Sequence, residues 1–503
     1  MNTLMLLEMT AAGFGERVAL GPLDRGMTYE ALQAAALSGG ARLRAGGRRT
    51  VVYIGENGPA FPVALFAAAA ANVPFLPLNY RLTPEQVADV AARQDRPLVI
   101  AGAHLDVLAA RCEEVLTPDE WIAQCTGPGA SPADQAAPAA PDTDDIAVLL
   151  QTSGTTSAPK SAVLRHRHLT AYTFGTVEFG SADEHDATLV SVPPYHIAAV
   201  ANLLTNLYAG RRIVYLEQFT ATGWLDLVRT ERITHAMVVP TMLARIVDEL
   251  ERTGEAAPPS LRAVSYGGSK MPRQVVERAL RAFPETDFTN AYGLTETSSS
   301  IAVLGPQEHR AALAATEPGE RARLGSAGLP LPDVAVEIRD DKGLPCPAGV
   351  TGDIWVRGPQ VAGEYLESGT TLDGGGWFST RDRGHLDEDG YLFVEGRSDD
   401  TIIRGGENIA PAEIESVLLD HPAVAEVAVA GVEDVEWGQR IAAFVVRRPG
   451  PPVDAADVQA WVRARLRGSK TPDLVMFLDE LPQTDTGKVL RRVLVERARA
   501  ASA

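Results

Sequence analysis

One stretch of the sequence, residues 149–160, reads Leu149-Leu150-Gln151-Thr152-Ser153-Gly154-Thr155-Thr156-Ser157-Ala158-Pro159-Lys160. The apolar run at residues 146–150 predicts a buried strand, and the glycine and hydroxyl residues after it predict a loop. Such a loop suits a polyphosphate, because its four hydroxyls donate hydrogen bonds, Gly154 lets N–H groups turn inward and Lys160 adds a positive charge. The sequence therefore predicts a phosphate-binding loop after this strand.

A second interpretation of this loop is the phosphate loop of nucleotide-hydrolysing motors, G-x-x-x-x-G-K-[ST]. Gly154 and Lys160-Ser161 have the separation that this motif requires. Pro159 excludes it, because the motor loop needs a glycine before its lysine to offer an N–H group to phosphate, and proline has none. A plain polar surface loop is the other alternative, and the motifs further along the chain outweigh it.

Length and composition indicate a globular protein of more than one domain. The chain has 503 residues, of which 45% are hydrophobic and 22% are charged, so it can bury a large core. The net charge is −19 and the pI is about 5.0. A protein that follows the phosphates of a nucleic acid needs a basic face, which these totals do not favour, so we expect no nucleic-acid partner.

The cysteines and the apolar runs indicate a reduced, cytoplasmic setting without a membrane span. Cys112, Cys125 and Cys346 form no C-x-x-C pair and are too few to cross-link so long a chain. Residues 1–10 lack the basic start of a secretory signal. The most apolar stretch, residues 63–78, is interrupted by an asparagine and two prolines, whereas a spanning helix needs ~20 apolar residues.

The first two thirds of the chain alternate between predicted helices and predicted strands. Helical patterns cover residues 31–43 and 61–71. Strand patterns cover residues 50–55, 97–101, 189–192, 236–240 and 261–268. This alternation predicts an α/β fold, in which a large N-terminal domain consists of helix-covered, mostly parallel sheets.

In the last third of the chain, the predicted strands are shorter and turn residues are more frequent. Short strands at residues 334–338, 352–358 and 390–394 predict a small β subdomain at about residues 325–398. Further on, strand and helix patterns cover residues 411–419, 424–429, 441–446 and 458–466. We therefore expect an N-terminal domain over residues 1–398 and a separate small α+β domain over residues 399–503.

Two histidines in Arg165-His166-Arg167-His168 form the one motif that suggests a protein-bound transition metal. No cysteine or acidic partner stands at the spacing that metal ligands require. We therefore interpret His166 and His168 as part of a solvated helix start.

Several predicted strands end in side chains suited to a ligand. One of them ends in a proline turn that presents His196, and ligands lie at strand ends in open α/β sheets. Gly267 and Gly268 end another strand and leave room for a flat group near the backbone. Tyr292 offers a ring face for stacking, and Glu296 offers hard oxygen ligands for a divalent cation.

Taken together, the motifs support a family assignment. In chain order they are Gln151-Thr152-Ser153-Gly154-Thr155-Thr156, Tyr266-Gly267-Gly268, Asn290-Ala291-Tyr292-Gly293-Leu294-Thr295-Glu296, Gly396-Arg397-Ser398-Asp399-Asp400 and Gly487-Lys488. This set resembles the adenylate-forming superfamily of acyl-CoA synthetases, nonribosomal adenylation domains and luciferases. The resemblance implies that a carboxylate attacks the α-phosphate of ATP to give an acyl-adenylate and pyrophosphate, and that a thiol then displaces AMP. It also implies that the C-terminal domain is mobile and rotates between the two steps.

The resemblance also implies a role for individual residues. The pyrophosphate cradle would consist of Thr152, Ser153, Gly154, Thr155, Thr156 and Lys160. The adenine site would consist of Gly267, Gly268, Asn290 and Tyr292, and the ribose contacts would be Asp382 and Arg397. Thr295 would contact the α-phosphate, Glu296 would bind Mg²⁺, Asp399 would be the hinge, and Lys488 would bridge carboxylate and phosphate. His196 would gate the acyl pocket, and the pantetheine tunnel of coenzyme A would be lined by Arg404, Gly405 and Gly406.

Three positions depart from the pattern of the superfamily. Ser157, Ser161 and Arg381 stand where its members often or usually have glycine, and each adds bulk near the nucleotide. One expectation is therefore that adenylation is impaired while the thioester step is intact. A separate adenylating enzyme would then supply the acyl-adenylate.

We expect an acyl-CoA ligase that uses ATP, Mg²⁺ and coenzyme A. Ala198, Ala199, Ala201 and residues 298–300 are small, which predicts a roomy pocket for a bulky, apolar carboxylic acid of fatty-acid or secondary metabolism. An adenylation enzyme that loads a carrier protein remains an alternative, although no Asp follows His196 to pair with an amino acid. An inactive adenylate-binding protein and a luciferase-type oxygenase also remain open, and the sequence does not determine the oligomeric state.

Overall fold

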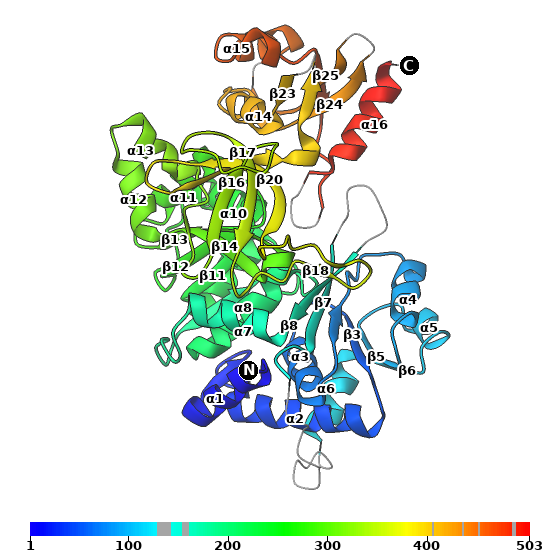
Figure 1. Ribbon diagram of the computed structural model, residues 1–503. Helices are drawn as coiled ribbons and strands as arrows, with labels where there is room; N and C mark the ends of the chain where they lie inside the picture. Colours follow the sequence, from blue (N-terminus) through cyan, green and yellow to red (C-terminus); the bar gives the residue numbers. More distant parts are fainter. Residues whose placement is uncertain are drawn as a thin grey trace.

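The computed structural model describes residues 1–127, 142–152, 160–404, 407–434, 437–450, 453–484 and 489–502. Within these ranges, only the backbone of Asn408 and Ser502 is described. Within these residues the chain forms two large sheets, a small antiparallel sheet and a C-terminal domain (Figure 1). In Figure 1 the N-terminus lies among the blue helices, and the orange and red C-terminal domain lies at the opposite end, beyond the small yellow sheet. The fold confirms the predicted class of an α/β protein with a small C-terminal domain.

The first large sheet has eight strands in the order β19-β18-β8-β7-β4-β3-β5-β6. Its strands are β3 (Thr50–Ile54), β4 (Phe75–Pro77), β5 (Pro97–Ala101), β6 (Glu114–Leu116), β7 (Ile146–Thr152), β8 (Lys160–Arg165), β18 (Glu364–Tyr365) and β19 (Gly369–Thr370). The pairs from β7 through β4, β3 and β5 to β6 are parallel, whereas β8 runs antiparallel to β7. The predicted phosphate loop therefore connects the two strands of a β-hairpin.

Helices cover both faces of this sheet, and two of them pack together unusually closely. They are α2 (Tyr29–Ala45), α3 (Ala60–Ala71), α4 (Pro84–Ala92), α5 (Leu105–Ala109) and α6 (Pro118–Thr126). A Cβ atom on Gly40 of α2 would lie 2.6 Å from the Cβ atom of Ala70 in α3, so glycine and alanine allow the two helices to approach. Helix α2 begins after Thr28, whose side chain accepts a hydrogen bond from the Ala31 N–H group.

The second large sheet has nine strands in the order β15-β14-β13-β12-β11-β9-β10-β1-β2. Its strands are β1 (Val18–Leu20), β2 (Met27–Thr28), β9 (Ala187–Val190), β10 (Arg212–Tyr215), β11 (His235–Val238), β12 (Ala263–Gly267), β13 (Asp287–Leu294), β14 (Ser299–Leu304) and β15 (Leu329–Pro330). The neighbouring strands β13, β12, β11, β9, β10 and β1 run parallel. At the edges, β2 pairs antiparallel with β1, β14 with β13 and β15 with β14. The mostly parallel arrangement that the sequence predicts is therefore confirmed.

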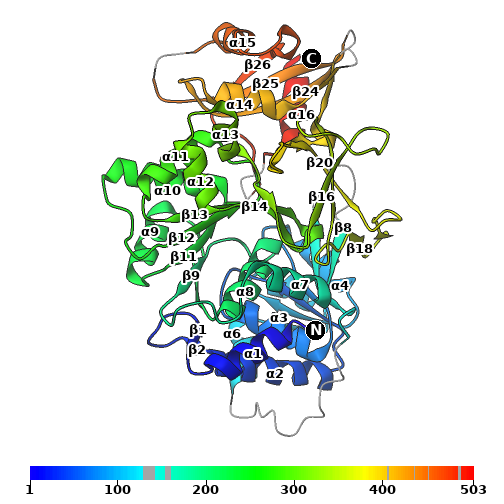
Figure 2. The ribbon, with the colours of Figure 1, turned by 60° about the vertical axis from the view of Figure 1, so that its left-hand side comes forward.

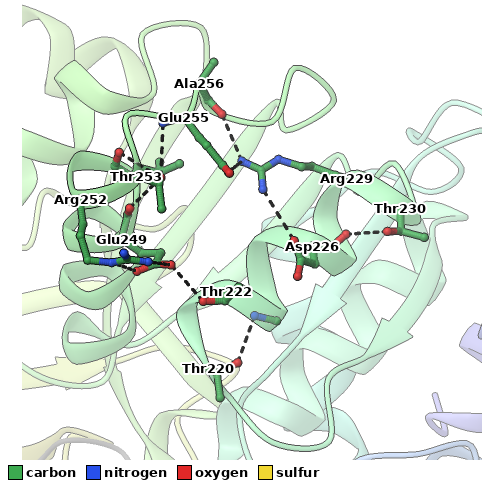
Figure 3. A network of polar contacts seen from close by, with 12 residues as sticks. Thr220, Thr222, Asp226, Arg229, Thr230, Glu249, Arg252, Thr253, Glu255 and Ala256 are labelled. Atoms are coloured by element: carbon green, nitrogen blue, oxygen red, sulfur yellow. Dashed lines mark hydrogen bonds and ion pairs between the residues drawn. The ribbon is translucent and has the colours of Figure 1, made fainter.

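A single hydrophobic core includes residues of both large sheets. The helices of this part are α1 (Leu4–Phe14), α7 (His166–Thr176), α8 (Ile197–Ala209), α9 (Ala221–Thr230), α10 (Pro240–Thr253), α11 (Arg273–Ala282), α12 (Pro306–Ala314) and α13 (Pro318–Ala322). Val148 of the first sheet, Val264 of the second and Leu203 of α8 belong to this core. Polar side chains connect α9 with α10 at the surface. Figure 3 shows Thr222 of α9 donating to Glu249 of α10 over 3.0 Å.

A small sheet and the C-terminal domain follow. The sheet is antiparallel in the order β16 (Ala335–Arg339), β17 (Gly352–Arg357), β20 (Phe378–Leu386) and β21 (Leu392–Arg397). The C-terminal domain contains the hairpin of β22 (Ile402–Arg404) and β23 (Glu407–Ile409), a sheet of β24 (Val424–Asp434), β25 (Gly438–Arg447) and β26 (Leu474–Leu478), and the helices α14 (Pro411–Leu419), α15 (Ala455–Arg463) and α16 (Arg491–Ser502). Figure 2 shows this domain beyond β16 and β20, away from the N-terminal helices.

The predicted helix start at residues 165–168 is confirmed, because α7 begins at His166, but the prediction that its histidines are solvated is wrong. His166 is 1% exposed and His168 is 3% exposed. The Nδ1 atom of His166 accepts a hydrogen bond from the Thr3 N–H group over 3.3 Å, and that of His168 accepts from the Arg165 N–H group over 3.2 Å. Burial lowers the pKa of His166 to about 4 and that of His168 to about 3, so both are neutral packing residues at neutral pH.

Among the described residues, no helix combines the length and the apolar composition that crossing a membrane requires.

Candidate active site

Two adjacent parallel strands, β12 and β13, hold the residues predicted to bind adenine. Tyr266 lies opposite Asn290, and Gly267 lies opposite Ala291. A Cβ atom on Gly267 would lie 2.3 Å from the Ala291 carbonyl oxygen, and Gly268 has φ +87°, a left-handed conformation. Both positions therefore require glycine for backbone reasons that hold even without a ligand.

The residues predicted to contact ribose form a bonded cluster. The Tyr292 hydroxyl donates to Asp382 Oδ2 over 2.6 Å, and Arg397 donates to Asp382 Oδ1 over 3.2 Å. The Asp382 residue is only 6% exposed. Burial and the Asp382 carboxylate raise the pKa of Tyr292, so the phenol remains a proton donor. The structure thus joins one residue of β13 to two residues of the small sheet.

Asn290 and the first residue of the next turn lie beside this cluster. The Asn290 side-chain amide donates to the Ser326 carbonyl over 2.9 Å, which fixes its orientation. Thr295 begins a short 3₁₀ turn (Thr295–Thr297) that directly follows β13. This turn places Glu296 immediately after Thr295 at the end of the strand.

Glu296 is held from the side chain and from the backbone. The residue is 8% exposed. Its Oε1 atom accepts a hydrogen bond of 2.5 Å from the Tyr365 hydroxyl, and its carbonyl oxygen accepts one of 2.8 Å from the Ala362 N–H group. Burial and the Glu296 charge raise the pKa of Tyr365, which therefore stays a donor at neutral pH.

Glu296 offers the hard oxygen atoms that Mg²⁺ prefers, so the residue fits the predicted metal ligand. Among the described residues there is no cluster of three or more His, Cys, Asp or Glu side chains that could hold a metal ion.

The two ends of the predicted phosphate loop lie on adjacent strands. The Thr152 hydroxyl donates to the Lys160 carbonyl over 3.3 Å, and Thr152 lies opposite Lys160 in the β7–β8 register. The Lys160 ammonium group lies 5.4 Å from the centre of the Tyr365 ring. The loop residues Ser153, Gly154, Thr155, Thr156 and Ser157 lie outside the described residues, as do Gly405, Gly406 and Lys488.

The departures Ser161 and Arg381 have different structural settings. Ser161 belongs to β8, and its N–H group donates to the Glu367 carboxylate over 2.9 Å. Arg381 is exposed and has φ +59°, a left-handed conformation that costs a residue with a side chain about 1 kcal/mol or more. Ser161 is therefore an ordinary strand residue, whereas Arg381 occupies a strained position next to the buried Asp382.

The predicted acyl side is packed by apolar and aromatic groups. His196 directly precedes α8, and its ring centre lies 4.5 Å from that of Tyr195. Ala199 and Ala201 are buried in this helix. Ser298 is fully buried and donates to the Gln360 carbonyl over 2.9 Å, so its side chain takes part in packing.

The described residues predicted for the hinge and the thiol tunnel belong to the C-terminal side. Asp399 is exposed and lies in a 3₁₀ turn (Ser398–Asp400) that follows β21. Arg404 donates to the Ser469 carbonyl over 2.7 Å and to Asp473 over 2.6 Å, within the C-terminal domain itself. In this structure Arg404 therefore does not join the cluster around Asp382.

Sequence reasoning missed three residues that organise the site. The Tyr365 hydroxyl donates to Glu296, which is 69 residues away in the sequence. The Gln360 side chain donates to the Ser300 carbonyl over 2.6 Å. Arg491 donates to Glu415 over 2.6 Å and to Asp400 over 3.3 Å. No local pattern marks them, because each contact is made between segments far apart in the chain.

Comparison with known proteins agrees with this geometry. Residues 7–366 match the family model "AMP-binding enzyme", and residues 413–488 match "AMP-binding enzyme C-terminal domain". The fatty acid–[acyl-carrier-protein] ligase ScoC of Streptomyces coeruleorubidus is 33% identical, over 93% of this chain and 88% of that protein. A feruloyl-CoA synthase of Amycolatopsis is 35% identical over 89% of each chain.

A solved structure shows the same fold. The o-succinylbenzoate CoA synthetase of Bacillus subtilis in complex with its acyl-adenylate intermediate matches with a TM-score of 0.83 and 29% identity, over 97% of each chain. The same enzyme has been solved with AMP, and with ATP and a magnesium ion. The chain therefore belongs to the AMP-binding enzyme family, the adenylate-forming acid–thiol ligases.

Proposed function

We propose that this protein joins a bulky aromatic carboxylic acid to coenzyme A through an acyl-adenylate. The observation that carries the proposal is the cluster of Tyr292, Asp382 and Arg397, which sets a buried carboxylate beside the glycine-ended strand β12. A carboxylate that is oriented by two donors can accept further hydrogen bonds from ribose hydroxyl groups.

In the first half-reaction, a carboxylate oxygen of the acid attacks the α-phosphorus of ATP, and the bond to pyrophosphate breaks. Asp382 and Arg397 would hold the ribose, Thr295 would contact the α-phosphate, and Lys160 would contact the polyphosphate. Lys488 would lie between the acid and the α-phosphate, where its positive charge offsets the repulsion of two anions.

Glu296 is the described residue that would hold Mg²⁺, with Thr295 next to it. When bound, the cation would offset negative charge on the phosphate oxygens. Glu296 contributes through its burial and its orientation, since the Tyr365 hydroxyl holds its carboxylate and the Ala362 N–H group holds its backbone carbonyl.

In the second half-reaction, the sulfur of the thiol attacks the acyl carbon, the thiol proton is lost and the bond to AMP breaks. Arg404 and the two glycines after it would face the thiol arm in this step. For Arg404 to reach the site in this step, the C-terminal domain, residues 399–503, would rotate relative to the N-terminal domain, residues 1–398, about the hinge Asp399.

The proposed substrate class rests on the small residues near His196 and on relatives. Ala198 and Ala199 lie in the first turn of α8, directly after His196, so the predicted acyl side carries small residues. A feruloyl-CoA synthase and an o-succinylbenzoate CoA synthetase are named for aromatic acyl groups. These two observations support a bulky aromatic acid.

The test is a panel of acids that includes acetate, straight-chain fatty acids and aromatic acids, incubated with ATP, Mg²⁺ and coenzyme A. We expect AMP and an aromatic acyl-CoA, detected by mass. A preference for acetate over every larger acid would overturn the substrate class. Absence of any thioester, from free acids and from synthetic acyl-adenylates alike, would favour an inactive adenylate-binding protein.

A carrier-protein acceptor is the second candidate, because ScoC is named as a fatty acid–[acyl-carrier-protein] ligase. The same panel with a phosphopantetheinylated carrier protein in place of coenzyme A compares the two acceptors directly. ATP–pyrophosphate exchange without any thiol measures the first half-reaction alone. Exchange that is absent while thioester forms from synthetic acyl-adenylate would support an enzyme that receives its adenylate from elsewhere.

A further inference from the structure

A short hairpin on the edge of the first large sheet touches both the phosphate side and the metal side of the site. It consists of β18 and β19, which pair through Tyr365 and Gly369. Tyr365 also lies opposite Ala162 of β8, so the hairpin extends the sheet next to the strand that begins with Lys160. This β18–β19 hairpin therefore lies beside the exit of the phosphate loop.

Backbone and side-chain contacts fix the hairpin to β8. Glu364 accepts hydrogen bonds of 3.0 and 2.7 Å from the Arg165 guanidinium group. The Leu366 N–H group donates to the Ser161 carbonyl over 2.9 Å, and Glu367 accepts from the Ser161 N–H group. Charged pairs with two parallel hydrogen bonds define orientation well, so the register of the hairpin on β8 is firmly set.

The start of the hairpin is also attached to the turn that carries Glu296. The N–H groups of Ala362 and Gly363 both donate to the Glu296 carbonyl oxygen, over 2.8 and 3.3 Å. The hairpin thus connects the strand that bears Lys160 with the turn that bears Glu296.

Tyr365 is the residue whose side chain makes this connection. Its hydroxyl donates to Glu296 Oε1 over 2.5 Å, and its ring lies 5.4 Å from the Lys160 ammonium group, within the range of a cation–π contact. The hydrogen bond engages one carboxylate oxygen of a buried side chain and holds its rotamer. The second oxygen, Oε2, is then the atom available to a divalent cation.

We propose that Tyr365 is a positioning residue that aims the Glu296 carboxylate at a divalent cation and holds Lys160 beside it. The proposal rests on the proposed function for the identity of the reaction. Hydrogen bonds to a metal-ligating carboxylate orient it. Losing such a partner typically costs roughly 10- to 100-fold in metal affinity or activity. Tyr365 would thereby couple the metal side and the phosphate side of the site.

The test compares ATP binding with and without Mg²⁺ in Tyr365→Phe, which keeps the ring and removes the hydroxyl. We expect the Mg²⁺ concentration for half-maximal ATP binding to rise by about 10-fold or more, whereas ATP binding without Mg²⁺ stays unchanged. In acid-dependent ATP–pyrophosphate exchange, the effect should appear in the KM for MgATP at limiting Mg²⁺. Thioester formation from synthetic acyl-adenylate should be unaffected, because that step needs no polyphosphate.

Glu364→Gln is the matched control, because it weakens the neighbouring pair with Arg165 without touching Glu296. It should leave the Mg²⁺ dependence unchanged. An unchanged Mg²⁺ dependence in Tyr365→Phe, or an equal change in Glu364→Gln, would overturn the proposal. Because equilibrium ATP binding needs no acid and no thiol, this outcome is distinguishable from a failure of the proposed function, which would show as absence of thioester in the unmodified protein.

Discussion

The nucleotide side of the site and the junction with the C-terminal domain are built in opposite ways. On the nucleotide side, Asp382 is buried and bonds to Tyr292 and Arg397 from two different sheets. At the junction, Gln274 of α11 donates to Asp420 over 2.9 Å, and this hydrogen bond is exposed to solvent. The first arrangement orients groups before any ligand binds, whereas the second can be broken at little cost.

The difference has a physical reason. Buried charged hydrogen bonds are expensive to leave unmade, so they hold strands in one arrangement. Exposed polar pairs contribute about 1 kcal/mol or less, because water replaces the lost contact. This combination would suit the proposed reaction, in which the C-terminal domain rotates between two half-reactions.

The largest expected effect concerns the junction. Asp399→Pro fixes φ near −65° and should trap one domain orientation. We expect one half-reaction to fall by roughly 100-fold or more while the other survives, because the site for the lost step is no longer assembled. ATP–pyrophosphate exchange and thioester formation from synthetic acyl-adenylate measure the two steps separately. Asp399→Ala, which leaves φ free, should retain both, and equal loss of both steps in Asp399→Pro would contradict the hinge assignment.

The next effect concerns the rigid side. Asp382→Ala leaves Tyr292 and Arg397 without their shared acceptor and removes the predicted ribose contact. Hydrogen bonds to charged groups contribute about 1.5–3 kcal/mol, so ATP binding should weaken by roughly 10- to 100-fold. Calorimetric titration with ATP measures this. Asp387→Asn, which alters the ion pair of Arg323 with a residue in the turn after β20, is the control and should bind ATP normally.

Acid should destabilise the N-terminal domain, which contains two buried histidines in α7, before it affects the junction. The pKa of His166 is about 4 and that of His168 about 3 in the folded protein, whereas the unfolded value is 6.5. Below pH 6.5 the unfolded chain therefore binds protons that the folded chain cannot. The free energy of unfolding should fall as pH decreases from 6.5 toward 4, by up to about 1.4 kcal/mol per pH unit for each histidine.

Urea unfolding at pH 7 and pH 5 measures this loss, and hydrogen exchange locates it. The amides of α7 should lose protection first, since both histidines lie in its first turn. The variant His166→Gln should show a smaller dependence on pH than the unmodified protein. If the amides of the C-terminal domain lose protection before those of α7, acid does not act first on the buried histidines and the prediction is wrong.

The smallest expected effect concerns the strained residue beside Asp382. The free energy of unfolding of Arg381→Gly should be about 1 kcal/mol higher than that of Arg381→Ala, because glycine adopts φ +59° without steric cost. Both variants lack the charge, so their difference isolates the backbone strain. Denaturant unfolding measures it, and equal stability of the two variants would mean that the position is not strained. ATP–pyrophosphate exchange in the same variants shows whether the guanidinium group impedes adenylation.

The sequence by itself determined the kind of fold and the identity of the candidate residues. The alternation of apolar runs predicted the parallel strands β3, β5, β9, β11 and β12, because a strand buried on both faces is apolar throughout. Turn and glycine signals placed the motifs at strand ends. The order of the motifs identified the superfamily, although the roles of the individual residues stay predictions.

Only the tertiary structure decided which of these residues meet. Tyr292 and Asp382 are 90 residues apart, and Glu296 and Tyr365 are 69 residues apart, so no local pattern could predict either hydrogen bond. His166 and His168 read as solvated, yet packing against the N-terminal residues buries them. The physical reason is the same in each case: periodicity reports how a segment meets its own neighbours, whereas burial and pairing depend on which distant segment covers it.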